Sequence, residues 1–503
     1  MSLGFALLGP LAGCDLGPDY ARPGAEMPVA WRASATTAAQ AWPSADWWRG
    51  FRSPELDALI ELARAQNLDI AAAIARVRQA DAQVRIAGAA LLPTLDATAT
   101  ANYQRSGSGS RRITGTTGQT LFNTAGSSSR YTDFRQYSTA GNVSYEADFW
   151  GKNAATAESA RASAVFSRFD QEVVALTVVT DVATTWFTAL DLQDRLAIAR
   201  QNLSDAEKTL TVIQARLAAG TATALDVAQQ AALVAGQRAV IPNLRNQLEQ
   251  QLIGLGILVG RPPEAITARP GTLVDLALPA VYPGLPSELL ARRPDVAEAE
   301  AQLVAANANI KAARAAFFPT IQLTGSAGYQ SLALTSLFGP GATVISLAAS
   351  LTQPIFDAGT LRGQLEQSRG RYDELVADYR KAILQAFTDV ENALTALRYT
   401  AEQLALEEQA VAIAQRAADI ARAQVAAGTV DITTVLTAQT TLYTDQDLLA
   451  QVRLAHFQAL LNLYKALGGG WSQPAGPIPD QFPGLSPGRI GGGFALPVGD
   501  NLR

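Results

Sequence analysis

The segment ALLPTLDATATANYQ, residues 90–104, decides the fold, because a second version of it, AFFPTIQLTGSAGYQ, occupies residues 316–330. Three aligned pairs of residues are each 226 positions apart (319 − 93, for example): Asp69 and Asp295, Pro93 and Pro319, and Tyr103 and Tyr329. A constant offset without a gap means that one structural unit is used twice in the chain.

The hydrophobic period changes after the Pro-Thr pair in both copies. Before it, apolar residues follow a helical period; after it, they alternate with polar residues or glycine over residues 94–104 and 320–330. Two later segments, 137–149 and 345–355, alternate in the same way and are the expected partner strands. Alternation of this length with a terminal aromatic ring is typical of a membrane-barrel strand, although periodicity alone fits soluble hairpins equally well.

The connection within the first predicted hairpin, 105–136, is rich in Gly, Ser and Thr, and that of the second, 331–342, is shorter. Four strands cannot close a barrel, because bacterial single-chain barrels begin at about eight. If these strands span a membrane, several chains must therefore share one barrel.

A very long helix, 152–219 or 361–427, follows each predicted hairpin and spans roughly 100 Å at about 1.5 Å per residue. Both helices end on Ala-Ala-Gly-Thr, where glycine caps the helix and the chain reverses into a return helix of about 40 residues. That return helix and the helix of about 25 residues before the strands (67–91 or 294–317) together match the long helix. We therefore expect two short helices stacked end to end beside each long one.

The composition leaves little room for chemistry. The net charge is −5 without a basic block, so nucleic acid is not an expected partner. Cys14 and His456 are the single cysteine and the single histidine, so neither an internal disulfide nor a metal site is expected. His456 lies in a helical pattern typical of coiled-coil surface, so we expect no enzyme and no cofactor. No run of 18 apolar residues is present, so a membrane role would come from strands or from a lipid.

Residues 1–13 are apolar and small and end in Leu-Ala-Gly before Cys14, a pattern similar to a bacterial lipobox. We expect cleavage before Cys14 and its acylation, since each buried CH₂ contributes about 0.8 kcal/mol to membrane binding. Two features depart from the usual pattern: no Lys or Arg precedes the apolar run, and Asp15 directs lipoproteins to the inner membrane in some bacteria. A chance cysteine in an apolar leader is the alternative.

Together these features resemble the outer-membrane efflux protein family of the TolC type, and most closely its OprM/NodT-like lipoprotein branch. The resemblance extends from Cys14 to Trp471. Its most specific segments are GLPSELLARRPD at 284–295, ARAAFFP at 313–319 and TGSAGY at 324–329.

The resemblance implies a mixed α + β membrane protein: a homotrimer with a 12-stranded β-barrel in the outer membrane, four strands per chain, continuing into a 12-helix periplasmic α-barrel. It implies the exit duct of a tripartite efflux pump, which passively conducts drugs or other small toxic compounds. The implied partners are a periplasmic adaptor (membrane fusion) protein, an inner-membrane RND transporter and outer-membrane lipid. A duct for heavy-metal efflux or type I protein secretion would share these features. The alternative from another class is a structural coiled-coil envelope protein.

Adaptor docking is implied at two hairpin tips: Arg216, Leu217, Gly220 and Thr221 in one, and Val425, Gly428 and Thr429 in the other. Asp226 matches a gate carboxylate, but the positions of its Tyr and Arg partners in TolC are here Val425 and Val430, so that latch is missing.

The positions of two constricting aspartates in TolC are here Thr434 and Thr437, which does not support an acidic ring at the mouth. Asp431, one turn away, is either a substitute or a solvated residue at a helix start. The residues predicted at the periplasmic gate are Asp226, Val430, Asp431, Thr434 and Thr437.

The predicted segments, in chain order, are a signal segment (1–13), a lipidated arm with an equatorial part (14–66), a first-repeat helix (67–93), a first barrel hairpin (94–150), a first helical hairpin (151–260), an equatorial linker (261–293), a second-repeat helix (294–319), a second barrel hairpin (320–357), a second helical hairpin (358–468) and a Pro/Gly-rich tail (469–503).

Overall fold

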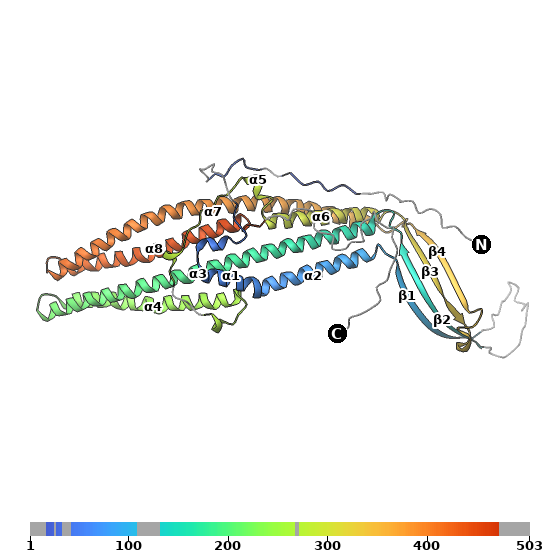
Figure 1. Cartoon of the computed structure of the whole chain (residues 1–503), viewed down its shortest axis with the longest axis horizontal. Helices are drawn as coiled ribbons and strands as arrows, with labels where there is room; N and C mark the ends of the chain where they lie inside the picture. The colour runs from blue at the N-terminus through green and yellow to red at the C-terminus, as the bar shows by residue number, and fades with distance from the viewer. Residues whose placement is uncertain (1–16, 25–26, 33–41, 108–130, 267–270, 472–503) are drawn as a thin grey trace, which may run out of the picture.

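The computed structural model describes residues 17–24, 27–32, 42–107, 131–266 and 271–471 (Figure 1). Its main elements, in chain order, are α1 (Pro54–Gln66), α2 (Leu68–Ala89), β1 (Thr94–Gly107), β2 (Tyr131–Glu146), α3 (Lys152–Ala218), α4 (Ala224–Leu258), α5 (Pro286–Leu289), α6 (Pro294–Ala315), β3 (Thr320–Ser331), β4 (Thr343–Thr352), α7 (Thr360–Ala426) and α8 (Ile432–Ala466). The predicted signal segment and Cys14 lie outside the described residues, as does the tail after Trp471.

The twofold repeat is confirmed in the lengths of the elements. α2 and α6 both have 22 residues, and their first residues are 226 positions apart (294 − 68). α3 and α7 both have 67 residues and begin 208 positions apart (360 − 152), as do α4 and α8, which have 35 residues each (432 − 224). The offset between corresponding residues of the two copies is therefore 18 positions smaller after the strands than before them (226 − 208), so the second hairpin, with the links to its helices, is 18 residues shorter than the first.

The predicted stacking of short helices beside a long one is confirmed. α2 and α4 follow each other along α3, and α6 and α8 follow each other along α7 (Figure 1). The return helices, with 35 residues each, are shorter than expected, because Val259 and Leu467 already cap them.

Both joints between stacked helices use the same contact. A Cβ atom at Gly260 would lie 2.2 Å from the Gln66 carbonyl oxygen, and one at Gly468 would lie 2.1 Å from that of Arg292. Both glycines have a positive φ, so each position needs glycine for its conformation and for the close approach. Gln66 and Arg292 are 226 positions apart, and the two glycines are 208 positions apart. These are the offsets of the helices to which they belong, so the joint is part of the repeated unit.

The sheet is antiparallel with strand order β1-β2-β3-β4. Its register pairs odd-numbered residues with odd-numbered residues in all three ladders, so the odd positions of all four strands share one face. That face carries most of the apolar side chains: Leu95, Ala97, Ala99, Ala101, Tyr103, Tyr137, Val143, Tyr145, Ile321, Leu323, Ala327, Tyr329, Ile345, Leu347, Ala349 and Leu351. The opposite face is mostly Thr, Ser, Asn and Gln. The sheet is therefore apolar on one side and polar on the other.

The predicted bounds of three strands, β1, β2 and β4, were wrong. β1 continues to Gly107 and β2 begins at Tyr131, inside the segment expected to be a loop. The pattern fails there because Asp133 and Arg135 occupy the apolar face while Phe134 occupies the polar one. The fourth strand begins two residues earlier than expected and ends at Thr352, before the Gln-Pro pair at 353–354.

The largest hydrophobic core lies midway along the molecule. There the Trp47–Phe51 turn and α1 pack on α3 and α8, with Phe51 stacked edge-on against Phe187 at a centroid distance of 5.0 Å. One helix, α3, contains a window of 18 residues with a mean hydropathy of 1.6 and is, by length and composition, apolar enough to cross a membrane, although it has no unbroken run of 18 apolar residues. Half of this window is buried within the chain, as in the core helix of a folded domain.

Candidate functional site

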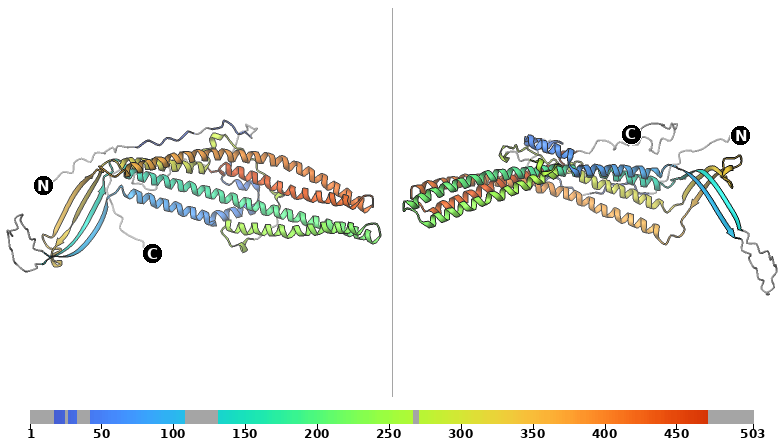
Figure 2. Two further views of the ribbon diagram at one scale, coloured as in Figure 1. Left: turned by 180° about the vertical axis from the view of Figure 1, so that it is seen from behind. Right: turned by 90° about the horizontal axis from the view of Figure 1, so that it is seen from below.

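The two hairpin tips lie at the end of the molecule opposite the sheet (Figure 2). In the first, the Thr221 amide donates to the Arg216 carbonyl (2.8 Å) and the Gly220 amide to the Leu217 carbonyl (2.9 Å), which is a Schellman turn. The second tip repeats the turn at Gly428 and Thr429, and both glycines have a φ of 74°. The geometry explains why glycine occupies both positions: the turn requires a left-handed residue.

Arg216 connects the two tips. Its Nη1 donates to the carbonyl of Val425 on the other hairpin, and its Nη2 donates to the carbonyl of Thr221 (3.3 Å). The side chain is half-buried. The Arg216 guanidinium thus forms its hydrogen bonds within the chain, while Leu217, Gly220 and Thr221 are exposed.

An apolar cluster lies just above the turns and joins both hairpins. Its buried members are Ile213, Ala421, Val425, Ile432 and Val435, with Val227 and Val430 packed against them. Val425 is only 3% exposed, so its side chain does not form part of the surface of the tip. Where the TolC-type latch would place a Tyr and an Arg, this chain has two valines that contribute to hydrophobic packing.

The two carboxylates predicted at the gate, Asp226 and Asp431, accept hydrogen bonds from the first turns of their own helices. Asp226 forms a capping box at the start of α4: the Thr223 amide donates to its Oδ2 (2.7 Å), and its own amide donates to Thr223 Oγ1 (3.2 Å). Asp431 is the N-cap of α8 and accepts from the Thr433 amide at 3.5 Å. Both residues therefore stabilise helix starts.

Thr434 and Thr437 are exposed on the first turns of α8. The Thr437 hydroxyl donates to the Thr433 carbonyl (2.8 Å), and Thr440 and Thr444 bond to their own helix in the same way. This stretch of α8 therefore presents threonine methyl groups and no charge.

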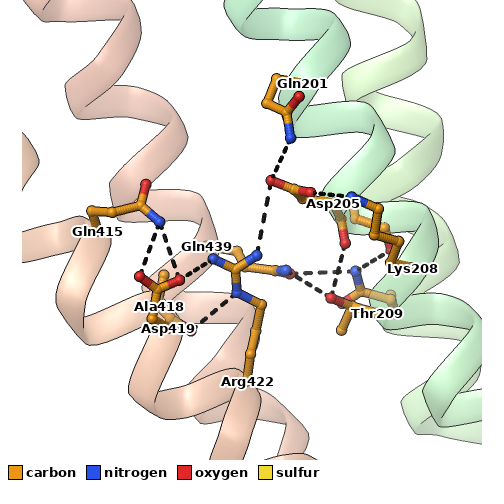
Figure 3. Close-up of polar contacts among 11 residues, drawn as sticks. Gln201, Asp205, Lys208, Thr209, Gln415, Ala418, Asp419, Arg422 and Gln439 are labelled. Atoms are coloured by element: carbon orange, nitrogen blue, oxygen red, sulfur yellow. Dashed lines mark hydrogen bonds and ion pairs between the residues drawn. The ribbon is translucent and has the colours of Figure 1, made fainter.

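A second connection between the hairpins was not predicted from the sequence. We call Asp205, Thr209, Gln230, Arg422 and Gln439 the inter-hairpin polar cluster; Figure 3 labels all of them except Gln230. Gln439 Nε2 donates to Thr209 Oγ1 at 3.0 Å, and Gln230 Nε2 lies 3.3 Å from Gln439 Oε1. Gln230 also donates to the Ala206 carbonyl at 3.0 Å. Because both glutamines are at most 1% exposed, these bonds are shielded from water.

Asp205 and Arg422 form the charged side of this cluster, with 3.8 Å between Asp205 Oδ2 and Arg422 Nη1 (Figure 3). Burial raises the pKa of the Asp205 carboxyl, but hydrogen bonds from Lys208 and Gln201 and the charges of Lys208 and Arg422 outweigh it, so the pKa lies below its usual value. The carboxylate therefore stays ionised at neutral pH.

The cluster carries a weak sequence signal. Gln230 and Gln439 interrupt apolar stripes that face the neighbouring helices, and a buried amide between apolar neighbours requires a partner. The sequence does not say which partner, because Thr209 and Gln439 are 230 residues apart.

The arm before α1 runs along the outside of α6 toward the sheet. Three contacts follow one another along α6 toward the sheet. Tyr20 Oη donates to Glu300 Oε1 at 3.4 Å, and Asn307 Nδ2 donates to the Pro18 carbonyl at 3.0 Å. Gly17 packs against Lys311 so closely that a Cβ atom on the glycine would lie 2.0 Å from Lys311 Cγ. The described arm thus begins one turn from the end of α6, beside the start of β3.

His456 contacts the Thr400 hydroxyl through Nδ1 at 2.9 Å, and burial lowers its pKa. In the part of the chain that the structure describes, no group of three or more His, Cys, Asp or Glu side chains could hold a metal ion.

The two long edges of the molecule expose apolar side chains. On α7, Tyr399, Leu406, Ile413 and Ile420 follow one another at intervals of seven residues, and each is more than half exposed. On α4, at the opposite edge, Leu225, Ile253 and Ile257 are exposed (Figure 1). Heptad spacing of exposed apolar residues is typical of a helix that packs against another helix.

Comparisons with known proteins agree with this architecture. The family model described as outer membrane efflux protein matches residues 59–261 and 285–469. The pyoverdine export outer membrane protein OpmQ of Pseudomonas aeruginosa is 41% identical over 461 residues, covering 92% of this chain and 95% of that protein. The solvent efflux pump outer membrane protein SrpC of Pseudomonas putida is 34% identical over 481 residues, covering 93% and 97%.

Among solved structures, the crystal structure of a membrane protein from Pseudomonas aeruginosa superimposes with a TM-score of 0.82 at 31% identity, covering 91% of this chain and 98% of that one. The structure of CusC gives a TM-score of 0.78 at 30% identity and covers 91% and 100%.

Proposed function

This chain belongs to the outer membrane efflux protein family, and from that premise we propose that three copies form the passive exit duct of a tripartite efflux pump. The observation that carries the proposal is the sheet: apolar and polar residues segregate onto its two faces, and its outer strands β1 and β4 have no further partner strand among the described residues. A lipid-exposed sheet cannot leave edges unpaired, because each unsatisfied peptide group costs several kcal/mol in lipid. The edges therefore pair between copies.

The helical edges support the same assembly. The heptad stripe on α7 and the exposed apolar residues of α4 lie on opposite sides of the chain, so α7 of one copy can pack against α4 of the next. An interface between different patches closes into a ring when the rotation per copy divides the circle. Three copies of four strands give 12, which is an even number within the range of bacterial barrels.

The closed end has two connections within each chain in place of the TolC-type latch. Arg216 and the apolar tip cluster tie the turns together, and the inter-hairpin polar cluster ties the helices above them. We propose that the duct opens when these contacts separate and that an adaptor docks on the exposed tip residues Leu217, Gly220, Thr221, Gly428 and Thr429.

We also propose that Cys14 carries the lipid anchor in the outer membrane. The support is the arm, whose described part begins at Gly17, close to the junction of α6 and β3. Three further residues can reach the membrane surface, since an extended residue spans about 3.3 Å or more.

The cargo that we propose is a small organic molecule, because OpmQ, which exports pyoverdine, and SrpC, which belongs to a solvent efflux pump, both match more than nine-tenths of the chain. A strain without this gene should become more susceptible to dyes and antibiotics, and the gene should restore resistance. Purified protein should be a detergent-dependent trimer; a stable monomer without detergent would contradict the duct.

A further inference from the structure

The apolar face of the sheet ends in a group of charges at one end of the first hairpin. Tyr103 of β1 pairs with Arg135 of β2, and the next pair on the same face is Arg105 with Asp133. All four residues have odd numbers, so they lie on the same face as Leu95. Near this end, the otherwise apolar face thus carries an aromatic ring, two arginines and an aspartate.

The height of these charges matches the edge of a membrane. Ten residues separate Leu95 from Arg105, which is about 34 Å along a strand. A tilt of about 40° reduces this to roughly 26 Å, close to the height of about 25 Å for the apolar band of an outer-membrane barrel. Because the helices leave the sheet at the Thr94 end, the arginines lie at the opposite end, toward the outer leaflet (Figure 1).

The charges do not cancel. Arg105 donates to both oxygens of Asp133, with Nε to Oδ1 at 2.7 Å and Nη2 to Oδ2 at 3.2 Å. The guanidinium of Arg135 lies over the Tyr103 ring at 5.5 Å and forms no ion pair within 4 Å with a carboxylate of the described residues. The group therefore carries one net positive charge, and the aromatic ring of Tyr103 lies against the second guanidinium.

The second hairpin provides an internal comparison. Tyr329, the counterpart of Tyr103, packs edge-on against Phe338 at 5.4 Å, and Ser331 and Thr343 occupy the places of Arg105 and Arg135. Residues 320–352 contain no Lys or Arg. Both hairpins thus have the aromatic ring of a membrane interface, but the cations belong to the first alone.

We propose that Arg135 and Arg105, beside Tyr103, bind the phosphate of an anionic lipid in the outer leaflet, one lipid per chain. A guanidinium matches phosphate because its parallel N–H groups donate to two oxygens at once. Asp133 holds Arg105 in place and weakens the site by its charge. This inference rests on the proposed barrel, since the site faces lipid only if the sheet spans a membrane.

Native mass spectrometry of the full chain in detergent tests the site, with diphosphorylated lipid A as the probe and the same glycolipid without phosphates as the comparison. Wild type should bind one phosphorylated lipid per chain in preference to the other. Arg135→Gln should weaken binding about fivefold, and Asp133→Asn should strengthen it by a similar factor, because a repelling charge is removed. Tyr329→Ala, at the equivalent place in the second hairpin, should bind as wild type does.

The opposite signs separate the site from a general loss of structure, which would weaken binding in both arginine and aspartate variants. Equal binding by wild type, Arg135→Gln and Asp133→Asn would overturn the proposal while leaving the trimeric barrel intact. Displacement of the lipid by an equal concentration of inorganic phosphate would also overturn it, since the site would then bind free anions. If no trimer forms in detergent, the barrel fails, and the lipid site fails with it.

Discussion

Arg216 is the residue that most directly joins the two tips. It lies in a predicted docking region, yet its guanidinium donates to carbonyl groups of both hairpins. A charged hydrogen bond contributes about 1.5–3 kcal/mol when it is well made. An adaptor that draws this side chain away would therefore remove a connection between the two tips.

Arg216→Ala should raise the open probability of the duct about tenfold, the factor that about 1.4 kcal/mol gives. Conductance of the reconstituted protein in planar bilayers measures this change. Arg245→Ala, at an exposed position of α4, is the matched control and should behave as wild type does. Unchanged conductance in the Arg216 variant would remove the residue from the gate.

Asp191 gives a prediction about pH. The residue is 1% exposed on α3, and its burial raises the pKa to about 6 despite Arg195, whose Nη1 is 3.8 Å away. The folded protein therefore binds a proton that the unfolded chain releases near its ordinary pKa of 3.8. The contribution of Asp191 to the free energy of unfolding should fall by about 3 kcal/mol as the pH rises from about 4 to about 6. Above that range, this contribution should be constant.

Asp191→Asn should abolish that fall, because the amide does not titrate. Arg195 keeps a partner in the variant, since its Nε also bonds to Asp447 at 2.7 Å. Guanidinium unfolding midpoints at pH 4.5 and pH 7 test this, with the exposed Asp69→Asn as the control. An equal dependence on pH in wild type and the Asp191 variant would show that this carboxyl does not carry it.

At the scale of elements, the helical hairpins are joined by buried amides where most neighbours are apolar. Gln439→Ala would remove both buried hydrogen bonds that join the hairpins, at a cost of about 1–3 kcal/mol. Thr209 and Gln230 would keep only partners in their own hairpin. We expect leak of small dyes from liposomes containing the duct to increase about tenfold. Thr440→Ala, at an exposed position of the same helix, should not change the leak. A leak that is the same in both variants would argue that the polar cluster is not part of the closure.

The tip turns permit a second test of the elements. Gly220→Val places a branched residue at a φ of 74°, which costs roughly 1–2 kcal/mol, although no atom lies within 4 Å of the new Cβ. Efflux should be impaired while trimers still assemble, because the turn is remote from the sheet. Ala218→Val, in the preceding helical turn, controls for added bulk. Normal efflux by the Gly220 variant would refute a docking role for this turn.

The sequence predicted the structure well where one hydrophobic period persists, and poorly where that period breaks. The repeat, the 67-residue helices and the glycine turns follow from spacing alone. The outer ends of β1 and β2 were missed because Arg105, Asp133 and Arg135 replace apolar residues on the apolar face of the sheet. The inter-hairpin contacts were missed because they join residues more than 200 positions apart, whose pairing depends on the packing of four helices.

At the scale of the whole molecule, a single chain leaves surfaces uncovered that are suited to contact with other chains. Its sheet ends in open strands, and its helical edges expose apolar stripes (Figures 1 and 2). A single copy in water would leave these surfaces uncovered, and large exposed apolar patches mark interaction sites. A duct therefore requires neighbouring copies of the chain.

Crosslinking between β1 and β4 tests this central claim most directly. Chains with cysteine at Ala99 in β1 and, in turn, at Leu347, Ala349 or Leu351 in β4 are oxidised in outer membranes, with each single substitution as the control for Cys14. If β1 and β4 pair between copies, at least one pairing should yield a covalent species of three chains, which the single variants do not form. Only monomers for all three pairings, in protein that reaches the membrane, would contradict it.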